Sequence, residues 1–482
     1  MLPFIHLFTS PNGCYCYDVN TEGVIELTEN LYNYLRAGNE IPEDISSIEE
    51  LDSSDREMLR SLTGRGYLSD HRVSTIRHNH ADDLEFQLTN RMNELILQVT
   101  QSCNLVCSYC PFANRTDGGF QRNHSSKKME WETARKSIDL FLENSSEIDN
   151  VGIGFYGGEP FMNFPLIRQA VEYADKLFVG KNVEYSLTTN GTLMTDEIIS
   201  YLKDHDFRVM FSIDGPESIH DINRRKADGS GSFRDAVSSL KKLWAAYGSR
   251  AKEKIRINTV INPETDFDEV THLFDDPFFE ESRIGIFPNL ASSNKLENEI
   301  QSRSDFNEKF SYDRFRAMMS RLGLVKGIKL DPISDFMALR QIEKTEMISE
   351  GDGRLGDITA PGGPCIPGQR RLFVNADGNF YPCEKVNELS EDTMIGNIND
   401  GIDLVQAERL INISQLTEDA CRECYAFRHC ASCGVNSVGE SRLTQESKLA
   451  HCPDIRKNFH NTLKLTALIR EIDSVYKRKI NI

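Results

Sequence analysis

Hydrophobic runs alternate with amphipathic stretches through the middle of the chain, from about Leu95 to residue 290. Between the apolar runs lie helical stretches such as 133–142, where Ala134, Ile138 and Phe141 share one face. Six strand–helix repeats predict a parallel sheet covered by helices, either an open α/β sheet or a partial (β/α)6 barrel of the TIM type. Folds of this class place their chemistry at the carboxyl ends of the strands. The six runs that read as buried strands are LILQV (95–99), VGIGFY (151–156), VEYSLTT (183–189), FRVMFSID (207–214), KIRINTVI (254–261) and RIGIFPN (283–289).

Residues 1–80 follow a different pattern, with short strands first and helices afterwards. The runs FIHLF, CYCYDV and VIEL are separated by the turn sequences SPNG and NTEG. Thr28 is a candidate N-cap for a helix that runs to Arg36. Ser54 and Glu57 have the spacing of a capping box at the start of a second helix. This order predicts a small winged-helix-like domain, followed by a polar linker and a barrel domain over 90–335.

The last region, 350–482, is rich in glycine, proline and cysteine, as in TAPGGPCIPG, and it lacks long periodic segments before a final helix from about Pro453. Seven of the chain's 12 cysteines lie here. Bound metal clusters would be expected to organise such a stretch, because clustered cysteines in a reducing compartment indicate metal more often than disulfides.

Composition and charge narrow the functional classes. With 39% hydrophobic and 27% charged residues and no apolar run long enough to cross a bilayer, the chain reads as globular, with no membrane partner. The start, MLPFIHLFTSPNG, has no basic segment before its apolar residues, so we expect a cytoplasmic protein and no signal peptide. The formal net charge of −19 argues against a nucleic-acid partner held through its phosphates.

The stretch CNLVCSYC places three cysteines, Cys103, Cys107 and Cys110, directly after the first strand predicted for the barrel. A zinc site usually takes four ligands. A four-iron cluster held by only three thiolates keeps one iron open to a small ligand. A zinc site or a chance trio of buried thiols is the alternative, because short motifs produce false matches.

Three further motifs stand at predicted strand ends: YGGEP, TTNG and SIDG. The glycines Gly157 and Gly158 allow a close approach of the backbone to a ligand, and Glu159 could accept hydrogen bonds from an ammonium group. Asp214 could equally cap a turn. A fourth motif, HDINR followed by Gly-Ser-Phe, spans 220–233 and contains Arg224, whose guanidinium suits bidentate binding of a carboxylate.

In this order the motifs resemble those of the radical S-adenosylmethionine (SAM) enzymes. The resemblance implies that the open iron chelates the amino and carboxylate groups of SAM. It also implies that an electron from the [4Fe–4S] cluster cleaves SAM, and that the resulting 5′-deoxyadenosyl radical abstracts hydrogen from the substrate. The implied contacts of the cofactor are Tyr156, Gly157, Gly158, Glu159, Asn190, Ser212, Asp214 and Arg224.

The C-terminal cysteines resemble the seven-cysteine SPASM extension, which implies two auxiliary [4Fe–4S] clusters and therefore three clusters in all. The resemblance gives Cys421, Cys424, Cys430 and Cys452 to the second auxiliary cluster, and Cys365, Cys383 and Cys433 to the first. Two residues separate Cys430 from Cys433, where the family usually has three. No fourth cysteine is evident for the first cluster, so a non-cysteine group or a substrate thiolate could complete it. A pair of zinc ribbons is the alternative.

Two further parts of the chain carry weaker resemblances. Glu384 follows Cys383, and in sulfatase-maturing relatives a carboxylate at the matching place acts as a base; a solvated glutamate is the alternative. The N-terminal domain resembles the leader-recognition element of ribosomal peptide maturases, in which a precursor leader is added as a strand to a sheet edge.

The whole order resembles thioether-forming maturases of sactipeptides and ranthipeptides. The resemblance implies a cysteine-rich precursor peptide with a leader as substrate, and a flavodoxin or ferredoxin as electron donor. The alternatives are carbon–carbon crosslinking, formylglycine formation of the sulfatase type, and an iron–sulfur electron carrier or peptide-binding scaffold without turnover.

Overall fold

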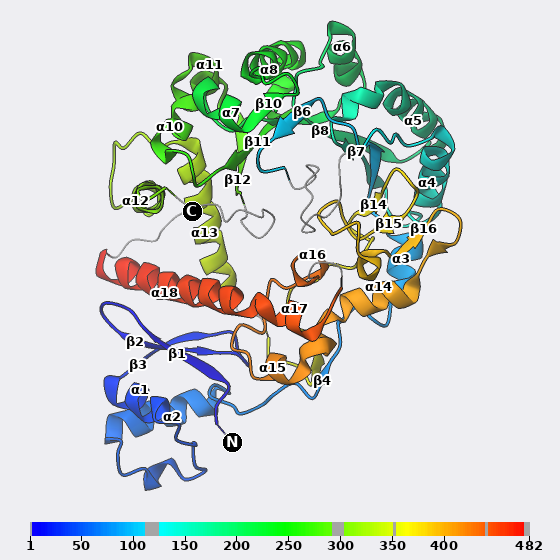
Figure 1. The fold of residues 1–482 in the computed structure, drawn as a ribbon. Helices are drawn as coiled ribbons and strands as arrows, with labels where there is room; N and C mark the ends of the chain where they lie inside the picture. The colour runs from blue at the N-terminus through cyan, green and yellow to red at the C-terminus, as the bar shows by residue number, and fades with distance from the viewer. Residues whose placement is uncertain (1, 111–124, 292–302, 350–352, 439–441, 477–482) are drawn as a thin grey trace.

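The computed structural model describes residues 2–110, 125–291, 303–349, 353–438 and 442–476. The long C-terminal helix α18 (Cys452–Tyr476) lies between the N-terminal strands and the rest of the molecule, as Figure 1 shows. The helix contacts β1 (Ile5–Thr9) on one side and α13 (Pro332–Ser349) on the other. None of the helices among the described residues combines the length and the apolar character that crossing a bilayer requires.

Six parallel strands form the sheet of a partial barrel, in the same order along the sheet as along the chain, which confirms the predicted fold. Each strand overlaps one of the six predicted runs. The strands are β5 (Glu94–Thr100), β7 (Asn150–Gly157), β8 (Asn182–Thr189), β9 (Arg208–Ser212), β11 (Ile255–Ile261) and β12 (Gly285–Leu290).

Helices cover the outer face of this sheet, as their amphipathic patterns predict. Ala134, Ile138 and Phe141 of the first covering helix are fully buried in the main hydrophobic core. The covering helices are α4 (Trp131–Glu143), α5 (Phe164–Leu177), α6 (Asp196–Asp204), α7 (Glu217–Asn223), α8 (Phe233–Tyr247), α9 (Ala251–Lys254), α10 (Phe267–Thr271) and α11 (Pro277–Ser282).

The C-terminal region continues the barrel sheet. The strand β14 (Leu372–Val374) pairs in parallel with β5, and β15 (Phe380–Tyr381) pairs antiparallel with β14. Both strands are fully buried, and both come from the region expected to be held by clusters. The sheet therefore places Cys383 just beyond its last strand, beside the barrel.

Short elements make up the rest of this region. They comprise β13 (Ile358–Thr359), which pairs with β4 (Thr75–Ile76), β16 (Gly396–Asn397), β17 (Gly401–Ile402), α14 (Leu404–Ile411), α15 (Glu418–Arg422), α16 (Gly434–Ser437) and α17 (Gln445–Ala450). The 16-residue helix α12 (Phe306–Arg321) lies earlier in the chain, after the last barrel strand, and packs against α13. The helix α3 (Leu84–Asn90) leads from the N-terminal domain into the barrel.

The N-terminal domain has three antiparallel strands, β1, β2 (Cys14–Asp18) and β3 (Val24–Leu27), followed by α1 (Glu29–Arg36) and α2 (Ser53–Gly64). Thr28 caps α1 as predicted, since its hydroxyl accepts the Leu31 N–H at 3.2 Å. The predicted capping box at Ser54 is wrong. Asp52 caps α2 by accepting the Asp55 N–H at 2.8 Å, because its side chain stands one residue before the first helical turn.

Candidate functional site

A cavity of about 310 Å³ opens at the carboxyl ends of β7, β8 and β9. All three cysteines of the CNLVCSYC motif line it, together with six of the eight predicted cofactor contacts. These six are Tyr156, Gly157, Gly158, Asn190, Ser212 and Arg224. The structure thus brings together the predicted site residues from Cys103 to Arg224, which are 121 positions apart, around one small volume.

Backbone pairing fixes the cysteine loop against the strand that carries Arg224. The short strands β6 (Leu105–Cys107) and β10 (Arg224–Lys226) run antiparallel, with Cys107 opposite Arg224. Burial raises the pKa of the Cys103 thiol to about 12 and that of Cys107 to about 11. These thiols therefore need a bound cation to become thiolates near neutral pH, which is the chemistry of metal ligands.

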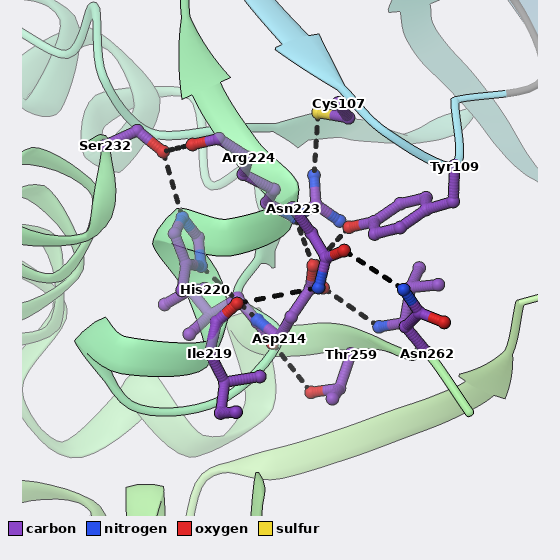
Figure 2. Close-up of polar contacts among 12 residues, drawn as sticks. Cys107, Tyr109, Asp214, Ile219, His220, Asn223, Arg224, Ser232, Thr259 and Asn262 are labelled. Atoms are coloured by element: carbon purple, nitrogen blue, oxygen red, sulfur yellow. Dashed lines mark hydrogen bonds and ion pairs between the residues drawn. The ribbon is translucent and has the colours of Figure 1, made fainter. Parts of the chain in front are cut away.

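A buried ion pair holds the Arg224 guanidinium at this wall (Figure 2). Its Nε donates to Asp214 Oδ2 at 2.9 Å, and its Nη1 lies 4.0 Å from Cys107 Sγ. The Tyr109 hydroxyl donates to the same carboxylate oxygen, and the Val260 N–H donates to Asp214 Oδ1 at 3.0 Å. Asp214 is fully buried and does not line the cavity, so it orients Arg224 from behind.

The HDINR and Gly-Ser-Phe motifs form the scaffold for this arginine (Figure 2). His220 Nε2 lies 3.0 Å from the Ser232 hydroxyl, which donates to the Arg224 carbonyl at 2.6 Å. Asp221 accepts the N–H groups of Ser232 at 2.8 Å and Phe233 at 2.9 Å. The motif therefore closes a loop on itself, and only Arg224 of these residues lines the cavity.

The two glycines of GGEP allow a close approach of the chain to itself. A Cβ on Gly157, whose φ is +150°, would lie 2.1 Å from the Thr100 carbonyl oxygen. A Cβ on Gly158 would lie 2.1 Å from the Ser102 carbonyl oxygen. Gly158 N–H donates to Thr100 O at 3.0 Å, so the glycines let β7 clasp the segment that leads to Cys103.

Glu159 lies behind the cavity wall, fully buried, and does not line the cavity. Its carboxylate accepts from the Asn190 N–H at 2.7 Å, the Thr189 hydroxyl at 2.8 Å and the Phe161 N–H at 3.3 Å. Burial raises its pKa to about 7. In this structure the carboxylate thus joins the ends of β7 and β8 from behind the wall of the cavity.

Electrostatic interactions link C-terminal cysteines that the resemblance assigns to the same cluster. Burial raises the pKa of Cys424, and the thiols of Cys421 and Cys452 add to the rise. In the first set, burial raises the pKa of the Cys383 thiol to about 11. The Glu384 carboxylate and the thiols of Cys365 and Cys433 add to this rise.

Cysteine thiolates are ligands of zinc as well as of iron–sulfur clusters. Among the described residues, no three His, Cys, Asp or Glu side chains converge closely enough to hold one metal ion.

Glu384 stands between the first cavity and a larger one of about 1050 Å³ on the inner side of the barrel sheet, and it lines both. Its Oε1 accepts from Arg371 Nη1 at 3.0 Å, while Arg371 Nε donates to Glu94 at 2.7 Å. Its Oε2 is buried and has no hydrogen-bond partner among the residues that the structure describes. A carboxylate oxygen is therefore available where the two cavities adjoin.

Comparison with known proteins agrees with this geometry. The radical SAM superfamily profile matches residues 97–276, and the SPASM profile, an iron-sulfur cluster-binding domain, matches residues 365–433. The chain contains a radical SAM domain and a SPASM domain. These domains support binding of SAM and of iron–sulfur clusters. The first profile includes all three cysteines of CNLVCSYC, and the second includes six of the seven C-terminal cysteines, all but Cys452.

Several relatives share these domains. The chain is 24% identical over 260 residues to the radical SAM cyclopropyl synthase TigE of Paramaledivibacter caminithermalis, covering 50% of this chain and 52% of that one. It is 23% identical over 354 residues to the cysteine-type anaerobic sulfatase-maturating enzyme of Clostridium novyi, covering 71% and 87%. The chain spans about half or less of the length of several other curated relatives that it matches.

The solved structure "Native anSMEcpe with bound AdoMet" matches with a TM-score of 0.55 at 20% identity. The match covers 78% of this chain and 99% of that one. At this identity the likeness concerns the fold, and it agrees with the partial barrel and its C-terminal continuation.

Sequence reasoning missed several residues of the site. Tyr109 lies inside CNLVCSYC, so its place between two cysteines was the available signal. Asn104, in the same motif, accepts from Asn190 Nδ2 at 2.9 Å and donates to the Thr192 hydroxyl at 2.7 Å. Arg371, by contrast, has no motif around it and reaches Glu384 only because β14 continues the barrel sheet.

Proposed function

We propose that this protein is a radical SAM peptide maturase that joins cysteine sulfur to a carbon of an acceptor residue in a ribosomally made precursor. The observation that carries the proposal is the set of three cysteines, Cys365, Cys383 and Cys433, beside Glu384. The two cysteines of the chain outside the three sets, Cys14 and Cys16, lie on β2 of the N-terminal domain. A cluster at this set would therefore keep a position that a substrate thiolate could take.

The residues present fit the groups that the domains imply. Cys103, Cys107 and Cys110 would hold the first cluster, with Arg224 placed to receive the carboxylate of SAM. The seven cysteines of the C-terminal region would hold two auxiliary clusters. When bound, SAM and the clusters supply radical chemistry, in which a hydrogen atom leaves a substrate carbon and one electron is accepted by an auxiliary cluster. A flavodoxin or ferredoxin is the proposed source of the electron that starts the reaction.

Glu384 is the proposed proton acceptor. Each thioether bridge breaks one C–H and one S–H bond and forms one C–S bond, so the peptide loses two hydrogens. The thiol proton needs a base, and the Oε2 of Glu384 has no hydrogen-bond partner among the described residues. Arg371 orients the carboxylate by donating to its Oε1. Glu384→Gln should therefore form few crosslinks while still producing 5′-deoxyadenosine, as measured by chromatography of the same reaction.

The open edge of β3 is the proposed docking site for the leader of the precursor. Tyr17 and Val24 form a non-hydrogen-bonded pair, because Asp18 N–H donates to Gly23 O at 2.9 Å. The Val24 carbonyl therefore points away from β2, where Arg470 of α18 donates to it at 2.7 Å. The same alternation turns the backbone N–H and C=O of Glu26 outward, and an added strand could pair with them.

Formylglycine formation is the second candidate, because the match to the sulfatase-maturating enzyme of Clostridium novyi covers 87% of that protein. Carbon–carbon crosslinking is a further alternative, since it uses the same hydrogen abstraction without a substrate thiol. All three reactions act on a peptide within the same cavity, so the product distinguishes them.

The deciding experiment is anaerobic co-expression with a cysteine-rich peptide encoded beside the gene, followed by intact and tandem mass spectrometry. Loss of two hydrogens per bridge, with the cysteines protected from alkylation, is the expected result. The same loss with free thiols would indicate carbon–carbon bonds. A new aldehyde that reacts with a hydrazide probe would indicate formylglycine.

A further inference from the structure

Lys448 on α17 is buried to an unusual degree for a lysine, with 1% of its surface exposed. Its Nζ donates to the Thr417 hydroxyl at 2.7 Å and to Cys421 Sγ at 3.6 Å. Among the described residues, no carboxylate lies within ion-pair distance of this ammonium group. A buried cation without an anionic partner is costly, so the fold must offer a negative charge here by another route.

Cysteines of the second predicted set lie beside Lys448. Cys421 Sγ also lies 3.3 Å from the Thr417 hydroxyl, and Cys452 Sγ donates to the Lys448 carbonyl at 3.8 Å. Burial raises the pKa of the Cys430 thiol to about 11, and the Lys448 charge opposes this rise. Cys424 in turn lies within the electrostatic reach of Cys421 and Cys452. The lysine is thus built into this set through its side chain and its backbone.

We propose that Lys448 is the counter-charge of the second auxiliary cluster and raises the reduction potential of that cluster. The proposal rests on the ligand set given above. A four-iron cluster held by four thiolates carries net negative charge, and its reduction by an external donor adds one more electron. An ammonium group beside a ligand sulfur stabilises the reduced form more than the oxidised form. Lys448 therefore acts through Cys421 as a positioning residue and touches neither SAM nor peptide.

The test compares Lys448→Met, which keeps the length of the side chain but removes its charge, with Lys448→Arg, which keeps the charge. Lys457→Met is the matched control, because Lys457 is exposed on the following helix α18. Each variant is reconstituted anaerobically with iron and sulfide. The midpoint potential of each cluster is then measured by potentiometry followed by electron paramagnetic resonance, and iron per chain is counted in parallel.

In Lys448→Met we expect a lower midpoint potential for one auxiliary signal, with the other signals unchanged. The potential should stay near the wild-type value in Lys448→Arg and in Lys457→Met. An unchanged potential in Lys448→Met with full iron content would overturn the proposal. If Lys448→Met assembles no second auxiliary cluster, Lys448→Arg decides: a retained cluster supports the charge role, and a lost one shows that packing alone matters.

A failure of the ligand set is a separate result. In that case wild-type protein would carry iron for fewer than three clusters, or Cys421→Ala would keep all three signals. If Cys421→Ala instead loses one signal, the affected signal is identified as the one to follow in the Lys448 variants. The two inferences therefore fail in different measurements.

Discussion

The buried pair between Asp214 and Arg224 gives a sharp test of how the cofactor wall is held. Asp214→Asn keeps the shape of the side chain but removes its charge, and one of its two terminal atoms becomes a donor. In the native chain both carboxylate oxygens accept, one from Arg224 Nε at 2.9 Å and Tyr109, the other from the Val260 N–H at 3.0 Å. The asparagine must therefore place its amide donor against at least one existing donor.

The magnitude follows from burial. The side chains of Asp214 and Arg224 are 0% and 8% exposed, so the variant leaves a buried guanidinium without its anion, which costs about 3–5 kcal/mol. For a domain of this size the cost corresponds to a fall in Tm of about 6–20 °C. We expect this fall in Tm in thermal unfolding of the protein, and faster hydrogen exchange in peptides from β9 and β10. SAM should also bind more weakly, because Arg224 is no longer oriented.

The chain offers a matched control in Glu217, whose carboxylate accepts from Arg234 Nε at 2.8 Å while the two side chains are 46% and 83% exposed. The contact is the same and only the burial differs, so Glu217→Gln should cost no more than about 1 kcal/mol. If both variants unfold at the same temperature and bind SAM equally well, the buried pair does not hold the arginine and the reasoning is wrong.

Three further predictions concern other parts of the site. Gly158→Ala puts a methyl group 2.1 Å from the Ser102 carbonyl oxygen, so it should lower the free energy of unfolding by about 1–3 kcal/mol and reduce the iron bound at the SAM site. Gly64→Ala, with open space around it, should do neither, and equal iron content in the two variants would contradict this prediction. Glu26→Pro removes an outward N–H of β3 and should weaken leader binding in a fluorescence anisotropy assay. Glu26→Ala keeps the N–H and should bind the leader normally. Equal leader affinities of the two variants would exclude this edge of β3 as the docking site. Burial lowers the pKa of His220 to about 4, although Asp214 and Asp221 oppose the shift and Arg224 adds to it, so the unfolded chain takes up the proton first as the pH falls. Up to about 3 kcal/mol of stability should therefore be present above pH 6.5 and be lost toward pH 4. In His220→Gln, thermal unfolding should lose this pH dependence.

Features that depend on local chemistry could be predicted from the sequence. The six strands of the barrel follow from apolar runs of strand length, and Thr28 caps its helix because it stands just before an amphipathic stretch. The motifs at the strand ends predicted a common site because parallel strands present their carboxyl ends at one edge. Six of the eight expected contacts do line one cavity.

Features that depend on contacts between distant segments were out of reach. The strands β14 and β15 are three and two residues long, too short for any periodicity to show, and they exist because they extend a sheet formed some 275 residues earlier. Asp214 and Glu159 were both expected to contact the cofactor, and only their donors in the folded chain show that they support the wall from behind. The burial of Lys448 is likewise a tertiary property that its own helix does not reveal.

The packing of the N-terminal domain changes how its role can be tested. One face of its sheet, including Phe8 and Tyr17, shares a hydrophobic cluster with Cys421, Cys424 and Phe459 of the C-terminal region. Arg428 donates to the carbonyls of Val19 and Asn20 at 2.8 Å, and His6 stacks on Tyr425 with 3.7 Å between ring centroids. Removing residues 1–80 would therefore expose the hydrophobic cluster around Cys421 and Cys424 as well as removing β3. Loss of activity in such a truncation could not be assigned to leader binding, because both parts would be disturbed together. A backbone change at Glu26 on the outer edge of β3 separates the two, because Glu26 is not part of the shared cluster.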